Sequence, residues 1–402
     1  MAVDAQEVPG SSDYAAMFRD YVLRGALHAL ELAQADAASL TPEEREQILH
    51  ALGFALDLPE TWPVVRDLLV EVAPKLEQAG YREEWIPYLR RGIDRCRAMG
   101  ESTVEAELAL QLGILLQFMG QLEAAREHYA LSAARAAAGG NRHQQARALN
   151  RLAFSLRLLG RLEEAEATVH QATDLLEPED VERAYSEFVR GIVALERGNR
   201  SLAIERYRQA MDIWERHGDV RMVAWTLNNL GSPLRSIGQY QEAIACYRRA
   251  IDLMQQIGDP LHAATARANL GNVYMTIDQP ERALALYVEA EQVFRQTHDH
   301  FRLANITTNL GRVYRRLGRW PEARQHLEAS IHLYDINGHQ WGRVNARDSL
   351  AEVELDLGRY AEAEAILREA WALVEAAGEG WAPALAADVA AHLEEAIQHQ
   401  VG

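Results

Sequence analysis

Residues 229–250 read NLGSPLRSIGQYQEAIACYRRA, and this stretch decides the fold of the chain. Forty residues later, residues 269–290 read NLGNVYMTIDQPERALALYVEA. Forty residues further, residues 309–330 read NLGRVYRRLGRWPEARQHLEAS. A period of about 20–50 residues is typical of an array of repeated structural units rather than of a single globule.

The repeat extends well beyond these three stretches. A small residue recurs at Ala73, Gly113, Ala153, Gly191, Gly231, Gly271, Gly311, Ala351 and Ala391. The spacing is forty residues throughout, except for 38 between Ala153 and Gly191. Seven residues after these positions come the expected turns, at Gly80, Gly120, Gly160, Gly198, Gly238, Asp278, Gly318 and Gly358. These two sets of recurring positions predict one helix on each side of every turn.

The residue types within one repeat indicate how its two helices pack. Gly231 lets the paired helix approach closely, because it has no side chain to keep the helix away. Gly238 can end the first helix in a left-handed conformation at little steric cost. Ala243 lets the second helix pack against the first, and Tyr247 fills the next turn. Each unit is therefore expected to be a helix–turn–helix with helices of about 16–18 residues.

These residues resemble the tetratricopeptide repeat family, which combines a Leu-Gly pair, a Tyr or Leu three residues later, and Ala and Tyr in the second helix. The forty-residue unit is longer than the usual one of about 34 residues. It is similar to the elongated repeats of kinesin light chains, of Pins/LGN polarity adaptors and of bacterial regulators with nucleotide-binding signalling modules. No such module is recognisable here. The resemblance implies an all-α fold, a right-handed α-solenoid of antiparallel helix pairs.

The chain divides into four predicted segments. Residues 1–12 are expected to be a disordered tail ending in Pro9-Gly10-Ser11-Ser12. Residues 13–60 are expected to form an N-terminal helical cap, in which Thr41 and Glu44 make a capping box. Residues 61–380 are expected to form eight tetratricopeptide-like helix pairs, and residues 381–402 a C-terminal capping helix.

Composition and charge exclude several classes of function. The net charge of −18 argues against binding to nucleic acid or to an anionic membrane. The first 13 residues lack the basic end and apolar core of a signal peptide, and the chain has no apolar run long enough to span a membrane. Cys96 and Cys246 match no disulfide or zinc spacing and are interpreted as core residues in a reducing cytoplasm. We expect a cytoplasmic protein; its oligomeric state is not predicted.

A short helix pair before a repeat array is also typical of a helix-turn-helix that binds DNA. Residues 1–60 contain 3 Arg and no Lys against 11 Asp and Glu. This charge would repel phosphate, so capping is the favoured interpretation of the pair.

Catalytic and metal-binding motifs are absent from the sequence. It contains no phosphate-binding loop, no nucleophile elbow, no His-Glu-x-x-His and no Cys-x-x-Cys. His298-Asp299-His300 comes nearest to a metal cluster, but it falls in a connection between repeats, where polar residues are common. We therefore expect no enzymatic activity and no cofactor.

The candidate binding residues lie on the first helix of each pair. The resemblance implies that these helices line the concave surface of the superhelix, where ligands of the family usually bind. Residues at spacings of three and four share one face of a helix. The stripe they define is Arg147, Asn150, Phe154 and Arg157; Tyr185, Phe188 and Ile192; Trp225, Asn228 and Arg235; Asn272; Asn305, Arg312, Arg315 and Arg316; and then the more acidic Asn345, Asp348 and Glu352.

A second column immediately precedes the Leu-Gly pair, at Asn229, Asn269 and Asn309. In peptide-binding arrays of the family, Asn on the concave helix often bonds to the ligand backbone, since its amide both donates and accepts. Arg151, Val189 and Ser349 hold the equivalent places elsewhere. The column is therefore not continuous.

These patterns predict a non-enzymatic scaffold that binds a peptide or helix of a partner protein in its concave groove. The expected ligand is acidic with an apolar anchor. The anchor would lie near Tyr185, Phe188 and Trp225, and the carboxylates near Arg157, Arg235 and Arg312. Two other interpretations stay open: the aromatic residues pack between helices or under an internal segment, or the protein is a sensory regulator that switches an effector by superhelix closure.

Overall fold

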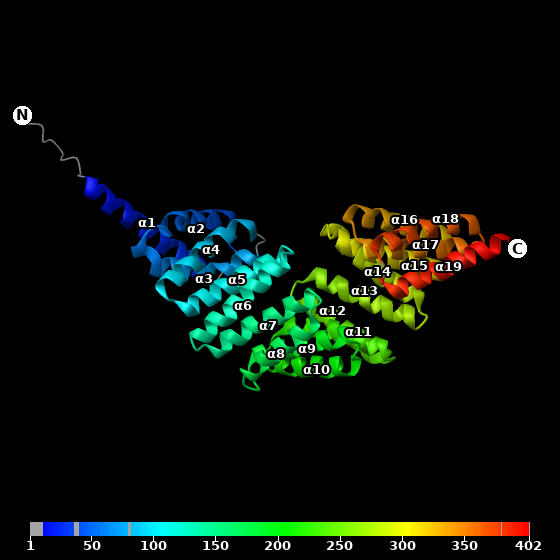
Figure 1. Cartoon of the computed structure of the whole chain (residues 1–402), viewed down its shortest axis with the longest axis horizontal. Coiled ribbons are helices and arrows are strands. Elements are labelled where there is room, and N and C mark those ends of the chain that lie inside the picture. The colour runs from blue at the N-terminus through cyan, green and yellow to red at the C-terminus, as the bar shows by residue number, and fades with distance from the viewer. Residues whose placement is uncertain (1–10, 36–39, 79–81, 379, 402) are drawn as a thin grey trace, which may run out of the picture. The chain divides into compact units, whose positions relative to one another are not determined.

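The computed structural model describes residues 11–35, 40–78, 82–378 and 380–401, and within these ranges the regular structure is entirely helical. The chain divides into two compact units, residues 1–197 and residues 198–402. Figure 1 follows the helices of both from α1 to α19. The all-α architecture of successive antiparallel helix pairs is confirmed.

The first unit contains nine helices among its described residues, with one short 3-10 turn, η1, between α2 and α3. Their bounds are α1 Ser11–Gln34, α2 Pro42–Ala55, η1 Pro59–Thr61, α3 Trp62–Gln78, α4 Arg82–Met99, α5 Ser102–Phe118, α6 Leu122–Ala138, α7 Arg142–Leu158, α8 Leu162–Asp174 and α9 Val181–Glu196. The helix α8 has only 13 residues. Its shortness, partly offset by the longer connection at residues 175–180, contributes to the single 38-residue spacing in the sequence.

The second unit contains ten helices among its described residues. Their bounds are α10 Arg200–His217, α11 Val220–Ser236, α12 Tyr240–Gln256, α13 Pro260–Thr276, α14 Pro280–Gln296, α15 His300–Arg316, α16 Trp320–Asn337, α17 Gln340–Asp356, α18 Tyr360–Ala377 and α19 Pro383–Val401. The last helix begins at Pro383, two residues after the predicted start at 381, because proline favours the first position of a helix.

The predicted close approach of the paired helices is confirmed. A methyl group added at Gly231 would lie 2.4 Å from the Tyr247 ring, and one added at Gly271 would lie 2.4 Å from Tyr287. Both tyrosines are almost fully buried. At these positions glycine leaves room for a large side chain from the second helix of the same pair, a tyrosine ring at Gly231 and Gly271 and Leu327 at Gly311.

The predicted turns also have the expected backbone. Gly80 lies outside the described residues. Every other predicted turn residue has positive φ: Gly120, Gly160, Gly198, Gly238, Asp278, Gly318 and Gly358. Asp278 keeps a φ of 57° without being glycine. Most turns between pairs also contain one residue with positive φ, with His298 at φ 53° as the non-glycine example, whereas the connection from α8 to α9 has none.

Within each unit most successive odd-numbered helices contact one another. In the first unit, α3 contacts α5, α5 contacts α7, and α7 contacts α9. In the second, α11 contacts α13, α15 contacts α17, and α17 contacts α19. Each even-numbered helix from α4 to α8 and from α12 to α18 packs against the odd-numbered helices on either side of it in the chain.

The N-terminal helices belong to the core of the first unit. Thr41 and Glu44 form the predicted capping box of α2, and α1 packs against both α2 and α3. Leu52 is fully buried in the cluster that continues into α3. One boundary was predicted wrongly: α1 begins at Ser11, so Ser11 and Ser12 are helical, while residues 1–10 of the predicted tail lie outside the described range.

Candidate functional site

The predicted stripe lies where neighbouring odd-numbered helices meet, and in the first unit its buried members are Asn150, Phe188 and Ile192. Asn150 on α7 is fully buried. Its amide nitrogen donates to the Glu182 carbonyl at 3.1 Å and to the Glu182 carboxylate at 3.2 Å, and its oxygen accepts from Ser186 at 2.8 Å. The assignment of Asn150 to ligand binding was wrong, because its hydrogen-bonding groups join α7 to α9.

The aromatic residues of the first unit are also used internally. Phe188 is 5% exposed and Ile192 is 8% exposed. Tyr185 is half-buried, its hydroxyl accepts from Arg151 at 2.8 Å, and burial raises its pKa. Phe154 is half-buried beneath the Arg157 guanidinium. The exposed apolar patch predicted at Phe188 is therefore wrong, because that side chain is buried.

In the second unit α11, α13 and α15 carry half-exposed asparagines, whereas Asn345 and Asp348 on α17 are buried. Asn269 donates to Asn228 at 3.1 Å, which connects α13 to α11. Asn309 donates to Asn272 at 3.4 Å, which connects α15 to α13. We call these four residues the asparagine ladder. All four are partly accessible to solvent.

Two further asparagines of the stripe bond within the unit. Asn229 donates to the Trp225 carbonyl at 2.8 Å on its own helix. Asn305 donates to the Phe301 carbonyl at 3.0 Å and accepts from the Tyr334 hydroxyl at 2.9 Å. They extend the set of amides on α11 and α15 without bridging the odd-numbered helices.

Four of the predicted arginines already pair with carboxylates. The pairs are Arg147 with Glu107 at 3.0 Å, Arg157 with Glu196 at 2.6 Å, Arg315 with Asp356 at 2.6 Å and Glu352 at 2.5 Å, and Arg316 with Asp278 at 2.8 Å. Their positive charge is compensated inside the chain, which weakens the prediction of a strongly acidic ligand.

Arg235 and Arg312 differ from those four. Arg312 donates to Ser349 at 2.8 Å and to the Asn345 amide oxygen at 2.7 Å. Arg235 donates to Thr276 at 3.3 Å. Within the described residues neither makes an ion pair. Both are half-buried, so each retains a positive charge beside the asparagine ladder.

Trp225 is the apolar side chain of this face. It is half-buried, and its ring centroid lies 4.9 Å from that of His262 on α13. Its indole N–H is buried and has no hydrogen-bond partner among the described residues. A buried donor without an acceptor costs about 1–3 kcal/mol, which a ligand carbonyl could recover.

The cysteines and the candidate metal cluster have structural roles. Burial raises the pKa of Cys96 to about 12 and that of Cys246 to about 11, so both thiols stay protonated and unreactive. Asp299 caps α15 by accepting from the Arg302 backbone at 2.9 Å. Across the described ranges, no group of three or more His, Cys, Asp or Glu residues is placed to hold a metal ion. In the same ranges no helix is both long and apolar enough to cross a membrane.

The internal ion pairs are the contacts that sequence reasoning missed. Glu107 stands forty residues before Arg147, Glu196 stands 39 after Arg157, and Asp356 stands 41 after Arg315. In a forty-residue array these separations place opposite charges on adjacent odd-numbered helices. A search for acids one period away from each arginine would have found them.

Helix pairs joined by left-handed turns, with an odd-numbered row that carries polar side chains, define a helical repeat protein of the solenoid class. The model of the tetratricopeptide repeat family matches the chain over residues 104–178, 145–216, 180–256, 222–296, 262–336 and 302–376. Together these cover about two thirds of the sequence. The chain belongs to the tetratricopeptide repeat family. The predicted pair around Ala73 lies outside the matched residues.

Several solved structures share this fold. One is a Signal Transduction ATPase with Numerous Domains (STAND) protein with a tetratricopeptide repeat sensor from Pyrococcus horikoshii, with TM-score 0.65, 15% identity, 91% of this chain covered and 53% of that chain. Another is the quorum sensor NprR from B. thuringiensis, with TM-score 0.59, 16% identity and coverage of 90% and 99%. A third is a Rap protein complexed with Competence and Sporulation Factor, with TM-score 0.50, 12% identity and coverage of 95% and 98%.

At these identities the similarity concerns the fold alone. The chain spans about half the length of the STAND protein. A search of curated protein sequences finds no match.

Proposed function

We propose that this chain is a non-enzymatic interaction module that binds an extended segment of a partner protein along α11, α13 and α15. The observation that carries the proposal is the asparagine ladder, whose half-exposed amides recur on three successive odd-numbered helices. An asparagine amide offers two donors and one acceptor with two lone pairs. Each ladder bond uses only part of this capacity. The Asn272 oxygen also accepts from the Tyr287 hydroxyl at 2.7 Å, so at that residue the N–H groups are what can serve a peptide backbone.

The spacing of the amides suits an extended peptide. Packed helices lie about 8–10 Å apart, and an extended chain advances about 3.3 Å per residue. A peptide that crosses these helices therefore meets a new amide about every third residue. Backbone contacts of this kind give affinity for many sequences, so specificity must come from neighbouring side chains.

Trp225, Arg235 and Arg312 are the proposed specificity residues. Trp225 offers an apolar surface and an unsatisfied N–H, while the two arginines offer charges that no carboxylate of the described chain neutralises. The proposed ligand carries one apolar side chain and at least one carboxylate. Phe188 is not among the proposed specificity residues, because it is buried.

A second proposal is that binding makes the protein a sensory regulator. What supports it is the fold shared with a quorum sensor and with a Rap protein in complex with a factor. Both proposals use the same ladder and differ in whether binding changes an effector. We further propose a cytoplasmic location, the expectation set by the two buried, unpaired cysteines.

The test begins with peptide display against the purified full-length chain, followed by affinity measurement of one selected peptide. We expect Asn269→Ala, Asn272→Ala and Trp225→Ala each to weaken binding about tenfold, or about 1.4 kcal/mol. Asn337→Ala is the matched control, because Asn337 is exposed at the end of α16.

Hydrogen exchange supplies the second measurement. We expect the bound peptide to protect amides in α11, α13 and α15. If the ladder variants retain their helicity and bind the peptide as tightly as the Asn337 control does, the assignment of this face is wrong. Turnover of a substrate by the purified protein would overturn the non-enzymatic part of the proposal.

A further inference from the structure

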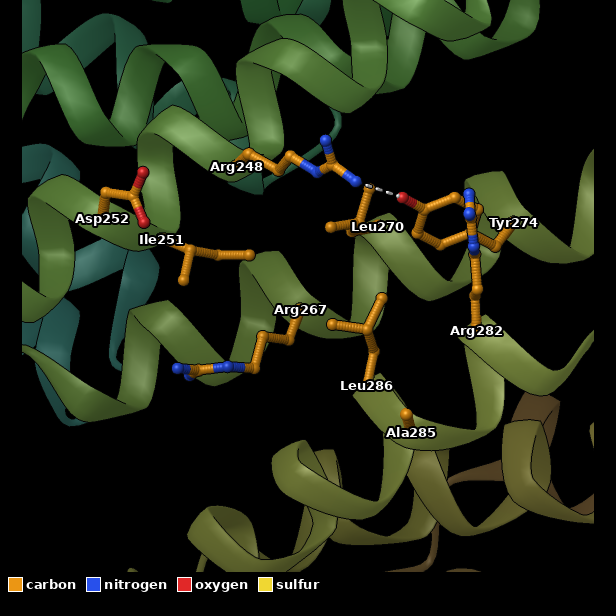
Figure 2. Close-up of a pocket in the computed structure, with 9 residues that line it drawn as sticks. All are labelled: Arg248, Ile251, Asp252, Arg267, Leu270, Tyr274, Arg282, Ala285 and Leu286. Atoms are coloured by element: carbon orange, nitrogen blue, oxygen red, sulfur yellow. Dashed lines mark hydrogen bonds between the residues drawn. The ribbon is translucent and has the colours of Figure 1, made fainter. Parts of the chain in front are cut away.

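A cavity of about 490 Å³ opens between α12, α13 and α14, entirely within the second unit (Figure 2). Its floor is formed by Leu270 and Tyr274 of α13, which are buried at 3% and 4% exposure. Ile251 and Leu286 provide apolar walls from the two even-numbered helices. The volume lies in the range of small-molecule sites, about 300–1,000 Å³.

This cavity lies on the opposite side of α13 from the asparagine ladder. Leu270 and Tyr274 are four residues apart and share one face of the helix. At 3.6 residues per turn, they lie about half a turn around the helix axis from Asn269 and Asn272. A ligand in the cavity would therefore be distinct from a peptide on the ladder.

Two arginines converge on the Tyr274 ring at one end of the cavity. Arg248 donates to the Tyr274 hydroxyl at 2.9 Å. The guanidinium carbon of Arg282 lies 5.5 Å from the ring centroid, and Arg282 donates to the Gln279 amide oxygen at 2.9 Å. Figure 2 shows both side chains reaching Tyr274 from different helices. In the part of the chain that the structure describes, neither arginine pairs with a carboxylate.

The other charged groups of the cavity do not neutralise this pair. Arg267 is already paired with Glu289 at 2.9 Å. In Figure 2, Asp252 and the Arg267 guanidinium lie at the far side of the cavity from Tyr274. Two positive charges thus face one buried tyrosine in a protein whose net charge is −18.

The preceding repeat shows what usually occupies these positions. Arg208 and Glu242 stand forty residues before Arg248 and Arg282, and they form an ion pair with each other. Forty residues after Arg282 the chain again has an acid, Glu322, which pairs with Arg319. In the repeat between α12 and α14, Arg282 stands where the two neighbouring repeats have a glutamate. This repeat therefore has a second cation in place of an acid. Its missing counter-charge is the observation that points to an external anion.

We propose that this cavity binds an oxyanion, a carboxylate or a phosphate monoester, carried by a small organic molecule with an apolar part. Arg248 and Arg282 contact the oxyanion, because guanidinium groups form paired, charge-assisted hydrogen bonds with such groups. The Tyr274 hydroxyl, which already accepts from Arg248, has its proton free to donate to the same anion. Ile251 and Leu286 contact the apolar part.

The test is titration calorimetry of the full-length chain with phenyl phosphate, phenylacetate, inorganic phosphate and the uncharged 2-phenylethanol. We expect at least one of the two aromatic oxyanions to bind at about 10 mM or below, and the alcohol not to bind. Binding of phenyl phosphate alone identifies a phosphate site, and binding of phenylacetate alone identifies a carboxylate site. Failure of both at this concentration overturns the proposal, as does equal binding of the alcohol.

Arg282→Glu restores the ion pair of the preceding repeat, and we expect it to weaken oxyanion binding at least tenfold. Arg295→Glu is its matched control, since it makes the same charge change on α14 outside the cavity. Tyr274→Phe keeps the ring and removes only the hydroxyl, so it should fold normally and bind a few-fold more weakly. If Arg282→Glu and Arg295→Glu bind equally well, the cavity is not the site. Ladder-peptide binding should be the same in both, which separates this result from the proposed function.

Discussion

The stripe of odd-numbered helices differs in accessibility between α7 and α9 of the first unit and α11 and α13 of the second. In the first unit it carries Asn150 and Phe188, which are buried and join α7 and α9 or fill the space beside them. In the second unit it carries Asn228, Asn269 and Asn272, which are half-exposed. The difference teaches that the repeat register specifies which way a residue faces, while the size of the neighbouring side chains decides whether solvent reaches it.

The largest expected effect compares the two aromatic residues of the stripe. Phe188→Ala should destabilise the first unit by about 3 kcal/mol, because it empties a buried position. Trp225→Ala should cost the second unit about 1–2 kcal/mol, since that ring is half-exposed. Urea unfolding followed by hydrogen exchange of α9 and α11 measures the two separately, which an array requires. Equal losses would show that the two units do not differ in this way.

A smaller effect compares the two asparagines. Asn150→Ala should destabilise the first unit by about 2 kcal/mol, because it removes three hydrogen bonds from a buried position and leaves the Ser186 hydroxyl only its longer bond to the Glu182 carbonyl at 3.2 Å. Asn269→Ala should cost about 1 kcal/mol or less, because water can replace its half-exposed bond to Asn228. The measurement is the same urea titration. A larger loss for Asn269 would show that the ladder belongs to the structural core rather than to a binding surface.

The smallest effect concerns pH and the last odd-numbered contact, between α17 and α19. His392 lies 2.8 Å from Asp348, and this hydrogen bond raises the pKa of His392, with Glu352 and Glu395 adding to the effect and burial opposing it. A histidine whose folded pKa is raised contributes stability that is complete below its unfolded pKa of about 6.5 and is lost as pH rises through the folded value.

We therefore expect α19 amides to be better protected at pH 6 than at pH 8.5, after correction for the intrinsic exchange rate. His392→Gln should remove that difference. His332→Gln, on an exposed position of α16, should keep it. A difference that survives in His392→Gln would assign the pH dependence to another group.

Much of the fold could be predicted because its determinants repeat. Gly231 and Tyr247 stand sixteen residues apart, and the same combination recurs at Gly271 and Tyr287, so the close helix contact was visible in the sequence. The capping box at Thr41 is equally local. Such features need no knowledge of neighbouring repeats.

The candidate site was only partly predictable because it depends on contacts between repeats. The burial of Phe188 could not be predicted, because it depends on surrounding side chains, which helical periodicity does not describe. The sequence around Arg147, Arg157 and Arg315 does not reveal their carboxylate partners, because each partner lies one repeat period away and becomes a neighbour only in the folded array. The cavity at Tyr274 required three helices to be placed together.

The left-handed turns have a consequence for how such a chain can change in length. From Gly198 to Gly358 a residue with positive φ occurs every twenty positions. These residues are all glycines except Asp278 and His298. Removing any forty-residue period between two equivalent turns would join one turn residue with positive φ to the equivalent position of another repeat. Every remaining helix would then keep its register. The array can therefore be shortened or lengthened by genetic recombination in complete periods, and the irregular interval between Gly160 and Gly198 is where such an exchange would fail.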